Sequence, residues 1–353
     1  MKPIKIGWIG LGVMGSVHVE QLLKLEGVSI AAVCDRDADR VKEWGDKLRI
    51  APSARYTDFE SMIQSSDIDA VLAVTPNDSH YEIVRLCLIH GKTLMTEKPF
   101  TRTYEEAEKL LELSEAYPDS ACMVGFSYRY VPSFRMSREM IKEGKLGPVR
   151  HVFIQYLQEW GGPLMNIPMN WRWDPAVTGT GVLADLGSHI LDSARFLIGE
   201  PTEITGMMSS FINKRKDAAS GDMVDVDIDD FASFTAVLEG GIPAVCHTSR
   251  NAFGCGNKLE VSVYGDYGAL HMGCEFGETL VWVHQNENGD KVTEKIQVPE
   301  RYKLKQMEDF ADLVRGDVRE ETPRLLDGYL NQRALEAVER SFREKRAITV
   351  GEI

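Results

Sequence analysis

The sequence lacks any apolar run that approaches the roughly 20 residues a membrane-spanning helix needs. Its first residues, MKPIKIGWIG, read directly as a strand, without the apolar core and cleavage site of a secretory signal. We therefore expect a cytoplasmic protein without a membrane partner.

Positive charge is also scarce. The 353 residues include 40 Lys and Arg against 54 Asp and Glu, a formal net charge of -14. A nucleic-acid backbone would be repelled by such a field, so we expect no nucleic-acid partner.

Cysteine is present but not grouped. The six cysteines are scattered, with no CxxC pair and no close histidine partner. A disulfide framework or a zinc cluster would space them differently. We expect reduced thiols and no metal site.

What the sequence does have begins with a glycine-rich turn. A strand-like segment is followed by Gly10-Leu11-Gly12-Val13-Met14-Gly15 and then by helical spacing of apolar residues. In such a GxGxxG turn, Gly10 permits the tight turn, Gly12 lets the backbone approach a pyrophosphate, and Gly15 allows close packing of helix on strand. The helix N-terminus offers free N–H groups to the anion.

A second apolar strand ends at Asp35, 20 positions after Gly15. That is the distance expected for an acid that holds the adenosine ribose hydroxyls. Asp35 favours NAD because a carboxylate repels a 2′-phosphate, whereas the neighbouring Arg36 leaves NADP open.

Strands and helices continue to alternate as far as residue 126, which predicts a doubly wound parallel sheet. Ligands bind such sheets beyond the carboxyl ends of the strands, where Thr75-Pro76-Asn77 and Glu97-Lys98-Pro99 fall. We predict an α/β Rossmann dinucleotide-binding domain in residues 1–126.

The pattern changes after this point. Residues 127–353 predict an α+β domain with a large, mostly antiparallel open sheet, which would bind substrate and form oligomers. A helix over 182–199 carries Asp185 and His189 four positions apart, and therefore on one face. The charged segment 214–230 is interpreted as a solvated loop.

Together these motifs resemble the Gfo/Idh/MocA oxidoreductases over essentially the whole chain. The resemblance rests on the GxGxxG, Asp35, TPN with His80, EKP at 97–99, and GTGVLADLGSHILD at 179–192. Many family members read GGG where this chain has Gly-Thr-Gly, a departure that leaves the resemblance intact.

The resemblance implies that Lys98 and His189 flank the sugar carbon that faces the nicotinamide, with Asp185 beside them. It also implies a cis Lys98–Pro99 bond, a Trp171-Arg172 pair near the cofactor, and a homodimer or homotetramer formed through the open sheet face. The residues expected at the cofactor are Gly10, Gly12, Val13, Met14, Gly15, Asp35, Arg36, Thr75, Pro76, Asn77, His80, Glu97, Lys98, Trp171 and Arg172.

The chemistry of these side chains agrees with oxidation of a secondary alcohol. His189 has a suitable ordinary pKa to accept the hydroxyl proton, and Lys98 can donate to the oxygen as negative charge develops. Asp185 either orients the imidazole or binds a neighbouring hydroxyl. Glu97 anchors the strand end or contacts the cofactor.

Substrate contacts are predicted from polar and aromatic side chains at strand ends and at the domain junction. They suit a polyhydroxylated ring, so we expect a small-molecule sugar or cyclic polyol such as an inositol, aldose or glycoside. The predicted substrate residues are Lys98, Arg129, Tyr130, Gln158, Trp160, Asp185 and His189.

Two other functions fit part of this pattern. An NAD-dependent glycosidase would oxidise C3 transiently, eliminate the glycosidic bond and return its cofactor unchanged. A non-catalytic dinucleotide-sensing regulator would be expected to lose the catalytic pair, but Lys98 and His189 are both present.

Overall fold

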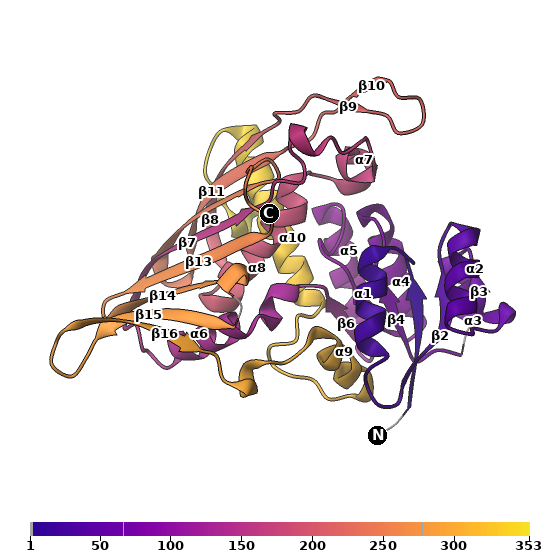
Figure 1. Cartoon of the computed structure of the whole chain (residues 1–353), viewed down its shortest axis with the longest axis horizontal. Helices are drawn as coiled ribbons and strands as arrows, with labels where there is room; N and C mark the ends of the chain where they lie inside the picture. Colours follow the sequence, from indigo (N-terminus) through magenta and orange to yellow (C-terminus); the bar gives the residue numbers. More distant parts are fainter. Residues whose placement is uncertain (1–2, 66, 277) are drawn as a thin grey trace. The chain divides into compact units, whose positions relative to one another are not determined.

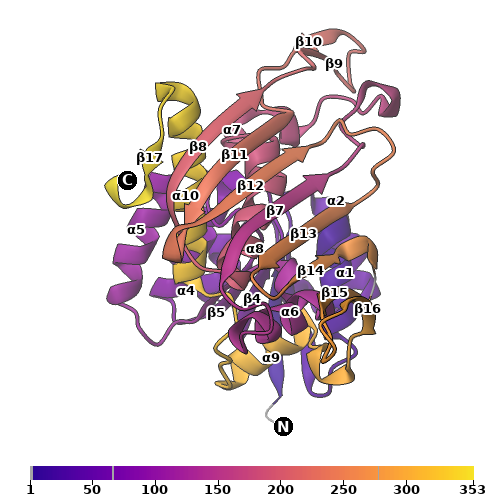
Figure 2. The same ribbon diagram turned by 90° about the vertical axis from the view of Figure 1, so that its left-hand side faces the viewer.

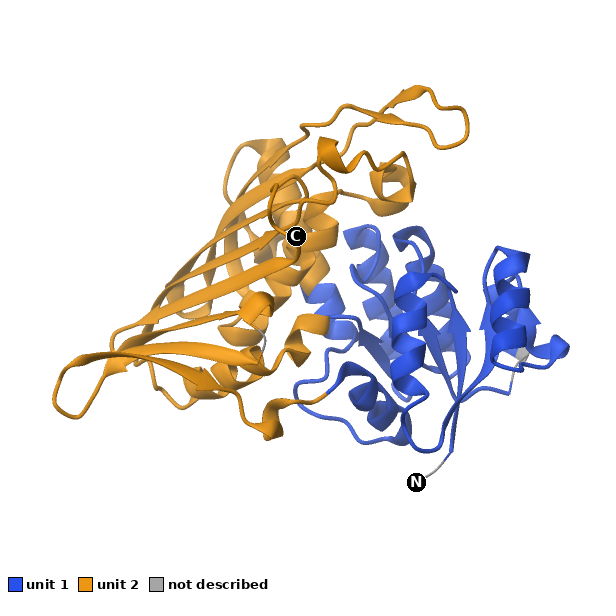
Figure 3. Cartoon of the chain, viewed as in Figure 1, with its two compact units in different colours: residues 1–126, 305–330 blue, residues 127–304, 331–353 orange. Residues whose placement is uncertain are grey.

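The computed structural model describes residues 3–65, 67–276 and 278–353, which divide into two compact units (Figure 3). Unit 1 comprises Met1–Phe126 and Lys305–Leu330, and unit 2 comprises Ser127–Leu304 and Asn331–Ile353. The first division, after Phe126, coincides with the predicted domain boundary. The prediction placed residues 305–330 in the second domain, whereas in the structure they pack with unit 1.

Unit 1 contains a parallel sheet in which the described residues form six strands, in the order β3-β2-β1-β4-β5-β6 (Figure 1). The order reverses beside β1, as in a Rossmann sheet, and β4 is buried at every residue. The predicted doubly wound parallel sheet is therefore confirmed. The strands are β1 (Ile4–Ile9), β2 (Val28–Cys34), β3 (Arg55–Tyr56), β4 (Ala70–Ala73), β5 (Thr93–Thr96) and β6 (Cys122–Val124).

Helices between these strands complete the core of unit 1. They are α1 (Val13–Leu22), α2 (Ala38–Lys47), α3 (Phe59–Ser65), α4 (His80–Ile89) and α5 (Tyr104–Glu115). One more helix, α9 (Gln306–Arg315), comes from the later segment and contacts β1, β5 and α1. It buries Met307 and Phe310, so unit 1 is completed by residues far along the chain.

Unit 2 contains a mixed sheet in which the described residues form nine strands, in the order β16-β15-β14-β13-β7-β12-β11-β8-β17. Among these pairs β7 and β12 are parallel, and the others are antiparallel. The predicted large, mostly antiparallel sheet is confirmed. The strands are β7 (Val149–Leu157), β8 (Pro201–Ser209), β11 (Phe231–Leu238), β12 (Ile242–Ser249), β13 (Lys258–Gly265), β14 (Gly268–Gly273), β15 (Thr279–Gln285), β16 (Lys291–Gln297) and β17 (Ile348–Thr349).

Helices α6 (Pro132–Lys142), α8 (Ser188–Leu197) and α10 (Leu325–Glu344) pack on one face of this sheet and lie behind it in Figure 2. Helix α10 starts in unit 1 and continues in unit 2. Along β7, β8 and β12 the alternate side chains point to the opposite face. There Phe153, Met207 and Val245 are 47%, 51% and 42% exposed.

Two short segments, β9 (Lys214–Lys216) and β10 (Met223–Asp225), pair antiparallel and form a hairpin. Among the described residues, no helix is long and apolar enough to cross a membrane. The same residues contain no cluster of His, Cys, Asp and Glu side chains that could hold a metal ion.

Candidate active site

The glycine-rich turn between β1 and α1 lies at the carboxyl edge of the unit 1 sheet. Gly10 has a φ of +87°, and a Cβ there would lie 2.1 Å from the carbonyl oxygen of Val74. A Cβ on Gly15 would lie 2.5 Å from the carbonyl oxygen of Gly10. At Gly12, no described heavy atom lies within 4 Å of an added Cβ. The packing of the protein therefore requires Gly10 and Gly15, whereas Gly12 leaves an open surface against which a ligand can approach the backbone.

Helix α1 begins at this open surface. Gly12 is its N-cap, none of the described side chains caps it, and its first turn carries no acidic residue. Val13 and Met14 are 81% and 51% exposed there. The helix N-terminus thus has backbone N–H groups for an anion, which is what the pyrophosphate of a dinucleotide requires.

Asp35 follows β2 directly, and its carboxylate lies against the same turn. Oδ2 accepts a hydrogen bond from the backbone N–H of Leu11 at 2.8 Å, and Oδ1 accepts one from the N–H of Asp37 at 3.0 Å. Arg36 is exposed, and a guanidinium nitrogen of Arg40 lies 3.9 Å from the carboxylate. A fixed carboxylate at this place fits an acceptor for ribose hydroxyl groups.

His80 joins the two turns that follow β4 and β5. Its side chain is fully buried, with Nδ1 2.9 Å from the carbonyl oxygen of Pro99 and Nε2 3.0 Å from that of Thr75. Burial lowers the pKa of His80, while the two carbonyl groups and the charges of Glu97 and Asp78 act in the opposite direction. His80 therefore connects the turn that contains Thr75 to the turn that contains Pro99, at this edge of the sheet.

The Lys98–Pro99 peptide bond in the second of these turns is cis, as the resemblance implies. The preceding residue, Glu97, receives a hydrogen bond from Nε2 of His18 on α1 at 2.8 Å. Burial raises the pKa of the Glu97 carboxyl, but the hydrogen bond and charge of His18 and the charge of Lys98 outweigh it and leave the pKa below its usual value. An ionised Glu97 thus lies between α1 and the partly exposed Lys98.

In unit 2, the helix that carries Asp185 starts from a buried carboxylate. Asp229 accepts hydrogen bonds from the backbone N–H groups of Gly181 and Leu183. The helix opens with a π-helical turn, Leu183–Gly187, and continues as α8. Such turns are frequent at functional sites, and this one contains Asp185. Asp229 therefore supplies the cap that fixes where the helix begins.

His189 lies in the first turn of α8 and is 6% exposed. Its ring packs edge-on against two tyrosines, with centroids 4.7 Å from Tyr128 and 5.8 Å from Tyr156. Burial raises the pKa of Tyr128 to about 12, and burial together with the neighbouring Tyr128 raises that of Tyr156 further. Both phenols therefore stay protonated and are neutral hydrogen-bonding groups beside the imidazole.

A chain of hydrogen bonds extends from these tyrosines. The hydroxyl groups of Tyr128 and Tyr156 lie 2.6 Å apart, and the Tyr156 hydroxyl donates to Oδ1 of Asn257 at 2.7 Å. Nε2 of Gln158 donates to the same oxygen at 2.8 Å, and Nε1 of Trp160 donates to Oε1 of Gln158 at 2.6 Å. Two predicted substrate residues, Gln158 and Trp160, are thus connected to the surroundings of His189.

Trp171 and Arg172 form a short 3₁₀ turn in the same unit. The Arg172 guanidinium lies 4.3 Å from the centroid of the Trp171 ring. Burial lowers the pKa of Arg172, and the negative charge of Asp185 opposes that shift. The pair therefore belongs to the surroundings of Asp185.

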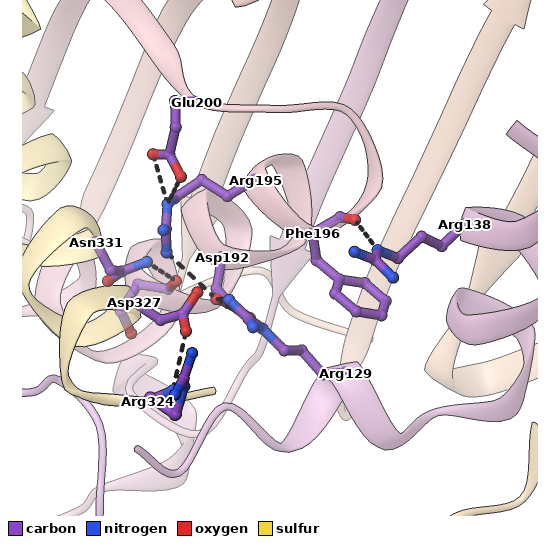
Figure 4. Close-up of polar contacts among 10 residues, drawn as sticks. Arg129, Arg138, Asp192, Arg195, Phe196, Glu200, Arg324, Asp327 and Asn331 are labelled. Atoms are coloured by element: carbon purple, nitrogen blue, oxygen red, sulfur yellow. Dashed lines mark hydrogen bonds and ion pairs between the residues drawn. The ribbon is translucent and has the colours of Figure 1, made fainter. Parts of the chain in front are cut away.

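Arg129 has a different environment from the one expected of a substrate contact. Its side chain is 7% exposed, and Nε and Nη2 donate to both oxygens of Asp192, with a shortest distance of 2.6 Å (Figure 4). Arg195 lies 3.7 Å from Asp192 and donates to Glu200 at 2.7 Å. The pair connects the segment of Tyr128 to α8 one turn after His189. Tyr130, at the same junction, is partly buried.

The interpretation of segment 214–230 as solvated is wrong for three of its charged residues. Arg215, Asp229 and Asp230 are all buried. Arg215 donates to the carbonyl oxygen of Gly161 at 2.6 Å, and Asp230 accepts from the backbone N–H groups of Phe211 and Ile212. The backbone groups of neighbouring loops account for this burial, because they need charged or polar partners.

Sequence reasoning missed three residues that support the site: His18, Asp229 and Asn257. A histidine three residues after the GxGxxG, on the same helical face as Gly15 and Leu22, was a usable signal for His18. Asp229 lay within a charged run, and Asn257 within a glycine-containing turn, so neither had a distinctive local pattern.

Comparison with known families gives two matches that together span most of the chain. Residues 4–126 match an oxidoreductase family described by its NAD-binding Rossmann fold, and residues 134–271 match the C-terminal domain of the Gfo/Idh/MocA proteins.

Similar proteins include sugar and inositol dehydrogenases. Levoglucosan dehydrogenase of Pseudarthrobacter phenanthrenivorans is 27% identical over 309 residues, which cover 82% of this chain and 79% of that protein. Myo-inositol 2-dehydrogenase of Thermotoga maritima is 25% identical over 354 residues, 99% of each chain. The crystal structure of an oxidoreductase domain protein from Kribbella flavida superposes with a TM-score of 0.90 at 30% identity and covers 99% of this chain and 100% of that one.

Proposed function

Because the chain belongs to the Gfo/Idh/MocA oxidoreductases, a family with an NAD-binding Rossmann domain, we propose that it oxidises a secondary hydroxyl of a cyclic polyol or sugar. The observation that carries this proposal is the polar environment of His189. A single buried imidazole lies against two neutral phenols that connect to an amide network, in the same unit as Asp185.

The residues of unit 1 fit a dinucleotide. Gly12 leaves an open backbone surface, α1 begins there without a side-chain cap among the described residues, and Asp35 holds its carboxylate beside the turn. When bound, NAD⁺ accepts the carbinol hydrogen together with its electron pair. The position of Asp35 favours NAD over NADP.

The side chains of this chain perform the proton chemistry. His189 accepts the proton of the substrate hydroxyl, since an imidazole is a suitable base near neutral pH. Lys98 donates a hydrogen bond to the same oxygen as negative charge develops on it. Asp185 binds a neighbouring hydroxyl or orients the imidazole. Glu97 holds the turn from which Lys98 extends.

The substrate class follows from the donors and acceptors available in unit 2. Gln158, Asn257, Tyr128 and Tyr156 are uncharged hydrogen-bonding groups, and Trp160 adds an aromatic ring. Arg129 is bonded to Asp192, so it offers no ready clamp for a carboxylate. Such a set suits the hydroxyl groups and the apolar face of an inositol, aldose or glycoside ring better than a 2-hydroxy acid.

The test is a panel of inositols, free hexoses, anhydrosugars and glycosides, each assayed for NADH and NADPH formation with products identified by mass. Wild type is compared with Lys98→Met, which keeps side-chain length but removes the ammonium group. Lys47→Met, an exposed helix substitution, is the matched control. We expect reduction of NAD⁺ on one substrate class, strongly reduced in Lys98→Met and kept in the control.

Three results would contradict this proposal. Cleavage of a glycoside without net NADH formation would indicate oxidation at C3 followed by elimination. Binding of NAD⁺ with no turnover on any substrate class would favour a dinucleotide sensor. Equal activity of Lys98→Met and wild type would remove Lys98 from the reaction.

We also propose that the open face of the unit 2 sheet joins copies of the chain into a homodimer or homotetramer. Phe153, Val245 and Met207 place exposed apolar side chains on this face, and Phe153 lies directly opposite Val245 in the sheet. Replacing Phe153 and Val245 together by lysine is expected to lower the mass in solution, as measured by light scattering, to that of a monomer. An unchanged mass would show that the assembly uses another surface.

A further inference from the structure

Arg250 is a buried cation that the reaction described above does not use. It follows the last residue of β12 and is 1% exposed, which makes it one of the largest fully buried side chains in unit 2. A guanidinium cannot be deprotonated under ordinary conditions, so its charge has to be balanced where it lies. Its contacts therefore indicate what the charge is for.

The first set of contacts is with the start of the helix that carries Asp185 and His189. Nη2 of Arg250 donates to the carbonyl oxygen of Gly181 at 2.7 Å and lies 3.4 Å from Oδ2 of Asp185. The N–H of Gly181 donates to the carboxylate of Asp229. The carbonyl oxygen of Gly181 also accepts a hydrogen bond from the N–H of Asp185 at 3.1 Å. Two buried side chains of opposite charge thus hold Gly181, one at its N–H and one at its C=O.

The second set of contacts is with the loop before that helix. Nη1 of Arg250 lies 3.4 Å from the carbonyl oxygen of Arg172, and the guanidinium lies 5.2 Å from the centroid of the Trp160 ring. The carbonyl oxygen of Arg250 accepts from the N–H of Gly161 at 2.9 Å. Arg250 therefore contacts a predicted substrate residue, Trp160, and a residue predicted near the cofactor, Arg172, as well as Asp185.

We propose that Arg250 is a positioning residue for the reaction: it fixes the carboxylate of Asp185 relative to the first turn of the helix that carries His189. This inference rests on the proposed function, since it concerns the same site. The planar guanidinium donates to the Gly181 carbonyl through Nη2 and to the Arg172 carbonyl through Nη1, while its charge pairs with the Asp185 carboxylate, which a single ammonium group does less well. Lysine is therefore a partial replacement and glutamine a poor one.

A purely structural arginine would have a different effect. Its loss would loosen the fold and lower activity by the same factor whether or not Asp185 is present. A positioning residue acts through Asp185, so removing the carboxylate first should remove most of the effect of the second change. A double-mutant cycle separates the two roles.

The experiment compares wild type, Arg250→Gln, Asp185→Asn and the double variant on the substrate that the panel identifies. We expect Arg250→Gln to lower kcat by roughly 10- to 100-fold in the wild-type background, since small displacements of a reacting group cost about that much. In the Asp185→Asn background we expect a loss smaller than about 3-fold, and partial recovery of kcat in Arg250→Lys. Equal fold-losses in both backgrounds would overturn the proposal.

Arg215→Gln is the matched control. Arg215 is also buried in unit 2, but its guanidinium lies 3.8 Å from the Trp173 ring centroid and donates to the carbonyl oxygen of Gly161 rather than pairing with Asp185. Its effect on kcat should be the same factor with and without the Asp185 carboxylate. If the loss of kcat in Arg215→Gln depends on Asp185 as strongly as the loss in Arg250→Gln does, the positioning role is not specific to Arg250, and the proposal fails.

Folding is followed on the same proteins, because the buried charge also stabilises the unit. If Arg250→Gln does not fold, the cycle is run with Arg250→Lys. The denaturant concentration at the midpoint of unfolding can be measured for all four proteins without a substrate. If wild type oxidises no polyol, the proposed function falls, and the midpoints still test the contact. Midpoint shifts that add independently of Asp185 would then overturn the link between Arg250 and Asp185.

Discussion

Nε2 of His18 lies 2.8 Å from Oε1 of Glu97, and this contact ties the helix that begins at the glycine-rich turn to the residue before Lys98. His18 and Glu97 lie 79 positions apart in the sequence of unit 1. Their contact makes the position of Lys98 depend on the same helix that would hold the dinucleotide.

The first prediction concerns the pH dependence of this pair. The pKa of Glu97 is lower in the folded chain than its ordinary value, so the ionised form contributes stability above that value and the contribution is lost as pH falls through the folded pKa. We expect Glu97→Gln to lower the melting temperature at pH 7 and to differ less and less from wild type below about pH 4. Melting curves across pH test this. A difference of the same size at every pH would contradict it.

The second prediction separates the roles of two glycines. At Gly10 an added Cβ would overlap the carbonyl group of Val74 in a positive-φ conformation, so Gly10→Ala should cost stability, by about 1–3 kcal/mol. At Gly12 the same change meets no described atom, so Gly12→Ala should lower the melting temperature much less than Gly10→Ala and still weaken binding of NAD⁺. Calorimetric titration and thermal unfolding distinguish the two. Normal NAD⁺ affinity in Gly12→Ala would exclude that surface as the pyrophosphate site.

The third prediction concerns the buried Arg129–Asp192 pair. Removing one partner leaves an uncompensated buried charge, which costs about 3–5 kcal/mol, whereas apolar replacement of both often costs little. We expect Arg129→Met and Asp192→Leu each to be strongly destabilising in denaturant unfolding. The double variant should lose clearly less than the two single losses combined, since Arg195 keeps Glu200 as a partner. Simple addition of the losses would mean that the pair contributes no coupling.

The fourth prediction tests Asn257 as the centre of the amide and phenol network. Its Oδ1 accepts from Tyr156 and Gln158, so Asn257→Ala frees both donors to move. We expect KM for the sugar or polyol to rise by roughly 10-fold, the effect of losing about 1.4 kcal/mol of binding, with unchanged affinity for NAD⁺. Asn286→Ala, in a turn before β16, is the control. A drop in kcat with KM unchanged would argue against a role in substrate binding.

The folds of both units could be predicted from the sequence because each fold leaves a pattern within short stretches of the chain. Strand–helix alternation and the GxGxxG identify the parallel sheet, and runs of alternating apolar residues identify most strands of the second sheet. Strand β16 lacks this signal because most of its side chains are exposed, so Lys291–Gln297 has little hydrophobic pattern.

Contacts between distant segments were beyond such reasoning. Arg129 was predicted to contact substrate because it is a cation near the domain junction, but its pairing with Asp192 depends on how α8 packs. The buried Asp229 was hidden for the same reason, since only the fold places it at the N–H groups of Gly181 and Leu183. Local pattern thus indicates candidate reacting residues, but it does not reveal the buried residues that pack around them.

The return of residues 305–330 to unit 1 has a consequence for synthesis of the protein. Helix α9 packs on β1, β5 and α1, and the backbone of β6 is bridged to Arg324. A ribosome therefore makes all of residues 127–304 before the segment that completes the nucleotide-binding unit emerges. Nascent chains of 126 residues should remain sensitive to protease, and protection of the first unit should be acquired only after residues 305–330 have emerged.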